Sequence, residues 1–174
     1  IDTITTTGNI VMPDNAILKI GTGADLQINH NGSHSFITNA TGDMNLSTSS
    51  GSLYIYNSLT DGDVVFQADN GSGTPTTYLT LDGGLGYTTV QKQMRFGDGV
   101  FLQIGDSADL AIYHQSGNSI IANEVGPLIL RQNLDDGDII FQADNGSGGV
   151  TAYLTLDGGL GYTTVQKAIR FNDG

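Results

Sequence analysis

The sequence predicts an all-β fold, arranged as an elongated repetitive fibre. Three observations lead to this prediction. Long stretches of the chain recur almost unchanged, and apolar and polar residues alternate with period two. Clusters of turn-forming residues separate the alternating runs at intervals of about 8–12 residues, a spacing typical of all-β arrays. No stretch longer than a turn has the spacing of apolar residues that an amphipathic helix requires.

Blocks of sequence occur twice in the chain, at two different offsets. The blocks that recur unchanged after 75 residues are 66–73 with 141–148, and 78–92 with 153–167. A further block, residues 20–30, matches residues 104–114 at an offset of 84. We therefore divide the chain into two repeat copies, residues 1–90 and residues 91–174.

The nine-residue difference between the offsets corresponds to an extra unit in the first copy, near residues 47–55. Residues 42–46 are followed nine positions later by a similar unit at 51–55, whereas the second copy holds one such unit, residues 126–130. A strand inserted into a globular core would disturb every layer. In a stack of units that contact only their neighbours, the insertion lengthens the stack, and it therefore favours an elongated fold.

The alternation of side chains predicts strands that each bury one face. Leu26, Ile28 and His30 share one face of a strand over residues 25–30, with Gln27 on the other. At the matching positions we expect Leu110 and Ile112 to face inward and Ala111 to face outward. The same pattern predicts further strands over 43–46, 52–56, 78–82 and the unit at 126–130. The turns between strands are expected at 31–33, 61–63, 69–71, 82–84 and 97–99.

Each predicted strand offers two or three inward apolar side chains, which are too few to fill a wide sandwich made by one copy. Three chains around a common axis would fill a narrow triangular core. This geometry predicts a homotrimeric β-helix or β-prism shaft, intertwined or side by side. A single-chain β-solenoid also buries thin layers and stays open as the alternative, although solenoids usually have a more uniform rung length than offsets of 75 and 84 suggest.

Three segments, residues 25–37, 135–144 and 153–167, together resemble sequence elements of the repetitive tail fibre proteins of marine bacteriophages. The resemblance extends over nearly the whole chain, from residue 14 onward. Asn29 and Asn31 depart from it, because that family usually has Tyr and Asp there. The resemblance implies the shaft of a homotrimeric tail fibre in the virion. It places contacts with the host receptor, such as a surface glycan, in another part of the fibre.

Two other functions stay open at the level of sequence. One is an adhesive extracellular filament made by a cell, which needs the same rigid rod as a phage fibre. The other is a glycan-cleaving tailspike, which abundant Asp residues would permit. A residue that recurs with the repeat is more easily explained by a repeated structural role, and no unique catalytic constellation is visible. We therefore expect no enzymatic activity and no cofactor.

The composition argues against several classes of partner. The formal net charge is -12, with 18 acidic residues against 6 basic ones, and Glu124 is the single Glu. Asp favours turns, and no basic stripe exists to neutralise the phosphates of a nucleic acid. The absence of Cys excludes disulfides and thiolate metal sites. No apolar run approaches the roughly 20 residues of a membrane span, so we expect no membrane insertion. Because residues 1–3 include neither an initiator Met nor a leader-like segment, we expect a piece of a longer chain.

The candidate metal ligands are His30 and His114, which occupy matching positions in the two copies. In a trimer, three imidazoles would meet at the axis, and imidazole is a common ligand of transition metals. The competing interpretation is that these side chains cap a turn and bind its backbone. His34 is not a matching candidate, because Asn118 stands at the corresponding position.

Three further features each have a functional and a structural interpretation. The acidic turns 61–63 and 135–138 could hold calcium through oxygen ligands, or be solvated turns. Exposed tyrosines could stack on sugars, or stiffen the sheets as cross-strand pairs. These tyrosines are Tyr54, Tyr56, Tyr87 and Tyr162.

We interpret a set of recurring glycines as turn residues that require a positive φ rather than as phosphate loops. These glycines are Gly83, Gly86, Gly158 and Gly161.

Overall fold

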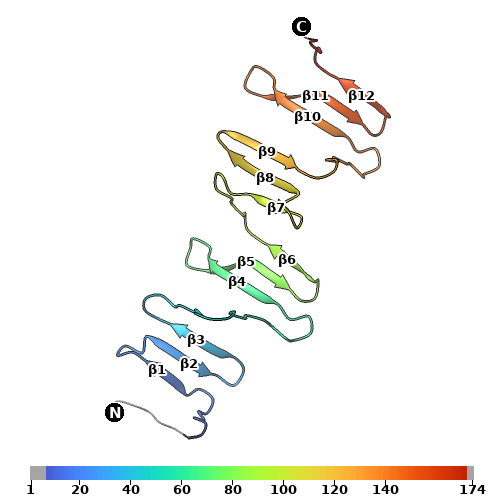
Figure 1. Cartoon of the computed structure of the whole chain (residues 1–174). Helices are drawn as coiled ribbons and strands as arrows, with labels where there is room; N and C mark the ends of the chain where they lie inside the picture. Colours follow the sequence, from blue (N-terminus) through green and yellow to red (C-terminus); the bar gives the residue numbers. More distant parts are fainter. Residues whose placement is uncertain (1–6, 172–174) are drawn as a thin grey trace. The chain divides into compact units, whose positions relative to one another are not determined.

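The computed structural model describes residues 7–171 and confirms the all-β prediction (Figure 1). The expectation drawn from residues 1–3 lies outside the described residues. The described part of the chain forms twelve strands and no helix, and so holds no helix of the length and hydropathy that a membrane crossing requires. The chain divides into two compact units, Ile1–Lys92 and Gln93–Gly174.

Each unit contains two three-stranded antiparallel sheets, in which strands pair in chain order. The first unit contains the sheets β1–β2–β3 and β4–β5–β6. Its strands are β1 (Ile17–Ile20), β2 (Leu26–His30), β3 (Ser35–Asn39), β4 (Val64–Asp69), β5 (Pro75–Asp82) and β6 (Tyr87–Val90). The second unit contains the sheets β7–β8–β9 and β10–β11–β12. Its strands are β7 (Leu102–Ile104), β8 (Leu110–Gln115), β9 (Asn118–Asn123), β10 (Ile139–Asp144), β11 (Val150–Asp157) and β12 (Tyr162–Val165).

Short polar turns close the hairpins, as the Asn-, Asp- and Gly-rich clusters predicted. In the β2–β3 turn, the Asn31 side-chain oxygen accepts hydrogen bonds from the backbone N–H groups of Ser33 (3.0 Å) and His34 (2.8 Å). Gly32 in the same turn has a φ of 91°, a conformation that glycine adopts without steric cost. The side chain of Asn31 thus takes the place of a backbone acceptor and holds the hairpin closed.

The recurring glycines separate into two kinds. Gly86 and Gly161 have φ angles of 71° and 70°, which confirms the prediction of a left-handed conformation. The same prediction is wrong for Gly83 and Gly158, whose φ angles are not in that region. A Cβ atom at Gly83 would collide with the backbone carbonyl oxygen of Gly62, and one at Gly158 would do so with Gly137. Here glycine is required because two turns approach each other closely.

Very little of the chain is buried. In the described residues the buried side chains are Ala111, Thr80 and Thr155, each with 8% exposure, and all three lie on the middle strand of a sheet. The predicted burial is therefore wrong for the chain by itself, since Ala111 is covered while Ile112 is 42% exposed. The small Ala111 side chain is screened by the two flanking strands. The larger Ile112 side chain projects beyond the sheet, where the described part of the chain covers it incompletely.

Three predicted strands, at 43–46, 52–56 and 126–130, are wrong for the single chain, because none of these segments belongs to a strand. Within the described residues, 43–56 and 126–133 form no backbone–backbone hydrogen bonds. Alternation of side chains marks a segment that can form a strand, but a strand also requires a neighbouring backbone in register. No other segment within residues 7–171 supplies that neighbour.

Candidate assembly surface

The register of β1–β2–β3 assigns every side chain of this sheet to one of two faces, because directly opposite residues of an antiparallel pair point to the same side. Ile28 lies opposite Leu18 on one strand and opposite Ile37 on the other. One face carries Leu18, Ile20, Leu26, Ile28, His30, Ser35, Ile37 and Asn39. The other carries Ile17, Lys19, Gln27, Asn29, Phe36 and Thr38. The prediction that Leu26, Ile28 and His30 share a face is confirmed.

The sheet β7–β8–β9 has the same register in the second unit. Ile112 lies opposite Leu102 and Ile121, in the same arrangement as Ile28. The face that corresponds to the first set carries Leu102, Ile104, Leu110, Ile112, His114, Ser119, Ile121 and Asn123. The positions that correspond to the second set are Phe101, Gln103, Ala111, Tyr113, Ile120 and Ala122.

An open groove runs along the first face of both sheets, and we call this face the groove face. In the first unit the groove has a volume of about 330 Å³, and Met12, Leu18 and Ile28 contribute to its lining. In the second unit it has a volume of about 860 Å³, and Phe96 and Leu102 are among its lining residues. Each groove lies between the sheet and a short apolar segment that precedes it.

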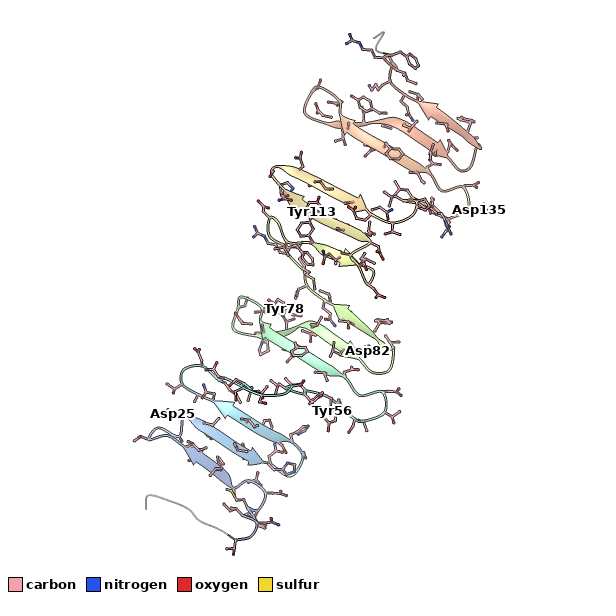
Figure 2. All side chains as sticks on the ribbon, in the orientation of Figure 1. Asp25, Tyr56, Tyr78, Asp82, Tyr113 and Asp135 are labelled. Carbon is pink, nitrogen blue, oxygen red and sulfur yellow. The ribbon has the colours of Figure 1, made fainter. Side chains whose placement is uncertain are left out.

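The sheets β4–β5–β6 and β10–β11–β12 also have a groove between an apolar face and the segment that precedes the sheet. Val64 and Leu81, which pair across β4 and β5, line one of about 350 Å³ together with Tyr56. Ile139 and Leu156 line another of about 490 Å³ in the second unit. Figure 2 shows Tyr56 on the strand-free segment between β3 and β4. All four sheets therefore combine a strand-free segment with an apolar face and leave a groove between them.

Sequence reasoning missed the two side chains that complete the first pair of grooves, Met12 and Phe96. The signal was present, because Met12 and Phe96 are themselves 84 residues apart. Each follows an apolar residue two positions earlier, Ile10 and Met94 respectively. This alternation of apolar residues continues the pattern of the strands beyond the blocks that repeat closely.

The groove face is apolar and exposed in the single chain. On β1–β2–β3, four of its apolar side chains are 40–59% exposed: Leu18 and Ile20 on β1, Ile28 on β2 and Ile37 on β3. Their counterparts Leu102, Ile104, Ile112 and Ile121 are 41–57% exposed. Exposed apolar side chains are ordinary when scattered singly, but a contiguous set over a sheet marks a surface that contacts a partner.

The two candidate metal ligands lie on the groove face. Nδ1 of His30 is 3.1 Å from Oγ of Ser35, and Nδ1 of His114 is 3.1 Å from Oγ of Ser119. The alternative interpretation predicted that these rings bind the turn backbone. Instead, each ring forms a hydrogen bond with a serine hydroxyl across the hairpin. Within the described residues of one chain, no three or more His, Asp or Glu side chains gather around a possible metal position. A metal site would need imidazoles from several copies and stays a prediction.

The acidic turns use their carboxylates for hydrogen bonds to the backbone. Asp63 accepts a hydrogen bond from the N–H of Gly83, and Asp138 accepts one from Gly158, both at 3.0 Å. Asp82 accepts one from Leu85 at 2.7 Å. The bonds of Asp63 and Asp138 join the two closely approaching turns described above, and the bond of Asp82 lies within one turn. In residues 7–171 no three or more Asp, Glu or His side chains gather around a possible ion position, and calcium binding stays a prediction.

The four tyrosines proposed as sugar-stacking residues lie at two kinds of position. Tyr54 and Tyr56 are 80% and 78% exposed on a segment without strands, while Tyr87 and Tyr162 begin β6 and β12. Sugar binding through these rings stays a prediction.

Comparison with known proteins adds no relative: no family model, no curated protein and no solved structure matches this chain.

Proposed function

We propose that this chain is a structural segment of a fibre in which three copies associate along their lengths to form an elongated shaft. The resemblance described above assigns such a shaft to a bacteriophage tail fibre in the virion, which holds a receptor-binding part away from the particle. In this proposal the partner of the chain is the chain itself. The chain has no catalytic role.

The observation that carries this proposal is the amount of surface that the single chain leaves exposed. Its accessible surface is 14649 Å². Two separate compact domains of half the mass would together expose about 9,800 Å². The unfolded chain would expose about 26,400 Å², so folding of one copy buries only about 45% of it, compared with about 60% in a 60-residue domain. The chain therefore lacks the core that a stable monomer requires.

The strand-free segments also support association of several copies. Residues 52–56 carry Leu53 and Ile55 in alternation with Tyr54 and Tyr56, yet their backbone forms no backbone–backbone hydrogen bonds with any described residue. Unpaired strand-forming backbone is a template for pairing with another chain. A neighbouring copy would supply both the hydrogen bonds and the apolar contacts.

The strand pairing favours this arrangement over a single-chain solenoid. Every strand pair in the described residues is antiparallel and joins neighbouring strands of the sequence. A parallel β-helix instead pairs each rung with the next one, so its core closes within one chain. The sheets of this protein leave their apolar groove face open, which suits a core completed by other copies.

Sedimentation equilibrium of the full chain tests the proposal, with circular dichroism to confirm β structure in the same sample. We expect about three times the chain mass of 18.2 kDa. A well-folded, protease-resistant species of a single chain mass would contradict the proposal and would favour the solenoid.

A further inference from the structure

The sheets β1–β2–β3 and β7–β8–β9 have identical residues on one face and different residues on the other. All eight residues of the groove face of β1–β2–β3 recur unchanged 84 positions later, in β7–β8–β9. None of the six residues on the opposite face recurs. Lys19 corresponds to Gln103, and Asn29 corresponds to Tyr113. The changes therefore alter charge, volume and polarity, and they are all confined to one side of the sheet.

This division reflects different physical constraints on the two faces. A side chain packed against another molecule is limited in volume and shape, because protein interfaces are packed as closely as interiors and respond to the loss of a single methylene. A solvent-exposed side chain can be replaced with little effect on stability. If neither face were covered by another molecule, sequence differences between the two sheets would be expected on both faces. The identity of one face and the variation of the other indicate that the groove face alone is covered.

The polar groups on the groove face are arranged as burial requires. The amide of Asn39 donates to the carbonyl oxygens of Thr41 (3.0 Å) and Gly42 (2.8 Å). Asn123 donates to Val125 and Gly126 in the same way. The imidazoles bind Ser35 and Ser119, as described above. Because a buried polar group without a partner is costly, hydrogen bonds made within the chain allow these residues to lie under a neighbouring molecule.

The amount of exposed surface indicates what covers the groove face. The chain exposes about 4,800 Å² more than two compact domains of its mass would. A standard interface needs only about 800 Å² from each partner, and obligate assemblies of identical chains use several times more. The same groove face occurs in both units, so a partner must offer the same complementary surface twice. A further copy of this chain, placed alongside in the same register, meets that requirement.

From these observations we infer that the groove faces of β1–β2–β3 and β7–β8–β9 are the surfaces through which copies of this chain bind one another, and that the opposite faces contact solvent. The inference rests on the proposed function, and it adds which side of each sheet points to the fibre interior. His30 and His114 then lie inside the assembly, and Lys19 lies outside.

Cysteine labelling tests this assignment, because the chain contains no Cys of its own. Ser35 and Thr38 are small, exposed in the single chain and on opposite faces of β3. In the assembled Ser35→Cys variant we expect a maleimide to react more than about tenfold more slowly than in the Thr38→Cys variant, because reaction requires opening of the interface. In denaturant both variants should react at the same rate.

A second pair of variants repeats the test in the other unit, with Ser119→Cys on the groove face and Gln103→Cys on the opposite face. The mass of each variant is measured on the same sample. Slow labelling of both groove-face variants in assembled protein supports the inference. Equal or reversed rates in assembled protein overturn the face assignment while the fibre proposal stands. A wild-type chain that sediments as a folded monomer overturns the fibre proposal itself.

Discussion

Truncation of the central groove-face isoleucine in each unit should reveal how much stability the copies provide to one another. We consider Ile28→Ala and Ile112→Ala, which occupy matching positions on the middle strands β2 and β8. In the single chain these side chains are 40% and 42% exposed. Each lines an open groove there, so a single chain and an assembly of several copies predict different losses of stability on truncation.

The magnitudes follow from the exposed fractions. Full burial of an Ile contributes about 1.5–3 kcal/mol, so a sheet that covers about three fifths of the side chain gains about 1–2 kcal/mol. If other copies cover the remainder, truncation also leaves a cavity, and the loss becomes about 2–5 kcal/mol per chain. Three independent sites at the same level would lower the stability of a trimer by about 6–15 kcal/mol.

Equilibrium unfolding in denaturant at several protein concentrations measures these losses, with Gln103→Ala on the opposite face as the matched control. We expect Ile28→Ala and Ile112→Ala both to lower stability, because each lies opposite a Leu and an Ile on the flanking strands, and the control to stay within about 0.5 kcal/mol of the wild type. The unfolding midpoint should rise with protein concentration. A concentration-independent midpoint, or a loss no larger than the roughly 1–2 kcal/mol per chain expected from the sheet alone, would refute the reasoning.

Three further predictions concern the insertion, the close turns and the histidines. Deletion of residues 47–55 should leave cooperative thermal unfolding intact, because the similar unit at 42–46 then takes the place of 51–55, as in the second copy, which has one such unit; loss of cooperativity would show that the unit is integral. Gly83→Ala should destabilise by about 1–3 kcal/mol through collision with the adjacent turn, whereas Gly84→Ala, whose Cβ would lie 3.6 Å from its nearest neighbours, should have little effect in the same denaturation assay. If imidazoles of several copies bind a metal, added Zn²⁺ should raise the Tm of the wild type but not of the His30→Gln, His114→Gln double variant, and equal responses would contradict the metal site.

The strands and faces could be predicted from the sequence because period-two alternation is a local property. Leu26, Ile28 and His30 share a face in the structure as their spacing predicts. The turns were predictable for the same reason, since the side chain of Asn31 binds backbone groups only two and three residues away. Local patterns thus determine which segments form hairpins and which side chains share a face.

The features that sequence reasoning missed depend on groups that are distant in the chain. Residues 52–56 alternate as well as β2 does, but they lack a backbone partner among the described residues. Gly83 is required by the carbonyl oxygen of Gly62, which lies 21 positions earlier, and not by its own φ angle. The burial of Ala111 beside an exposed Ile112 depends on side-chain size and on what covers the sheet. None of these can be read from periodicity.

Folding and assembly of this chain are therefore expected to be one process. Three strands with an apolar face are close to the smallest sheet that is stable independently, and an apolar face gains stability only when it is removed from water. In each of the four sheets that face lines an open groove, and the chain buries about 45% of its unfolded surface, less than even a small domain does. In the proposed fibre, contacts between copies supply the missing stability, as in obligate oligomers that have no stable folded monomer. A substitution on the groove face should then weaken folding and association together, whereas one at an exposed position of the opposite face, such as Gln103, should affect neither.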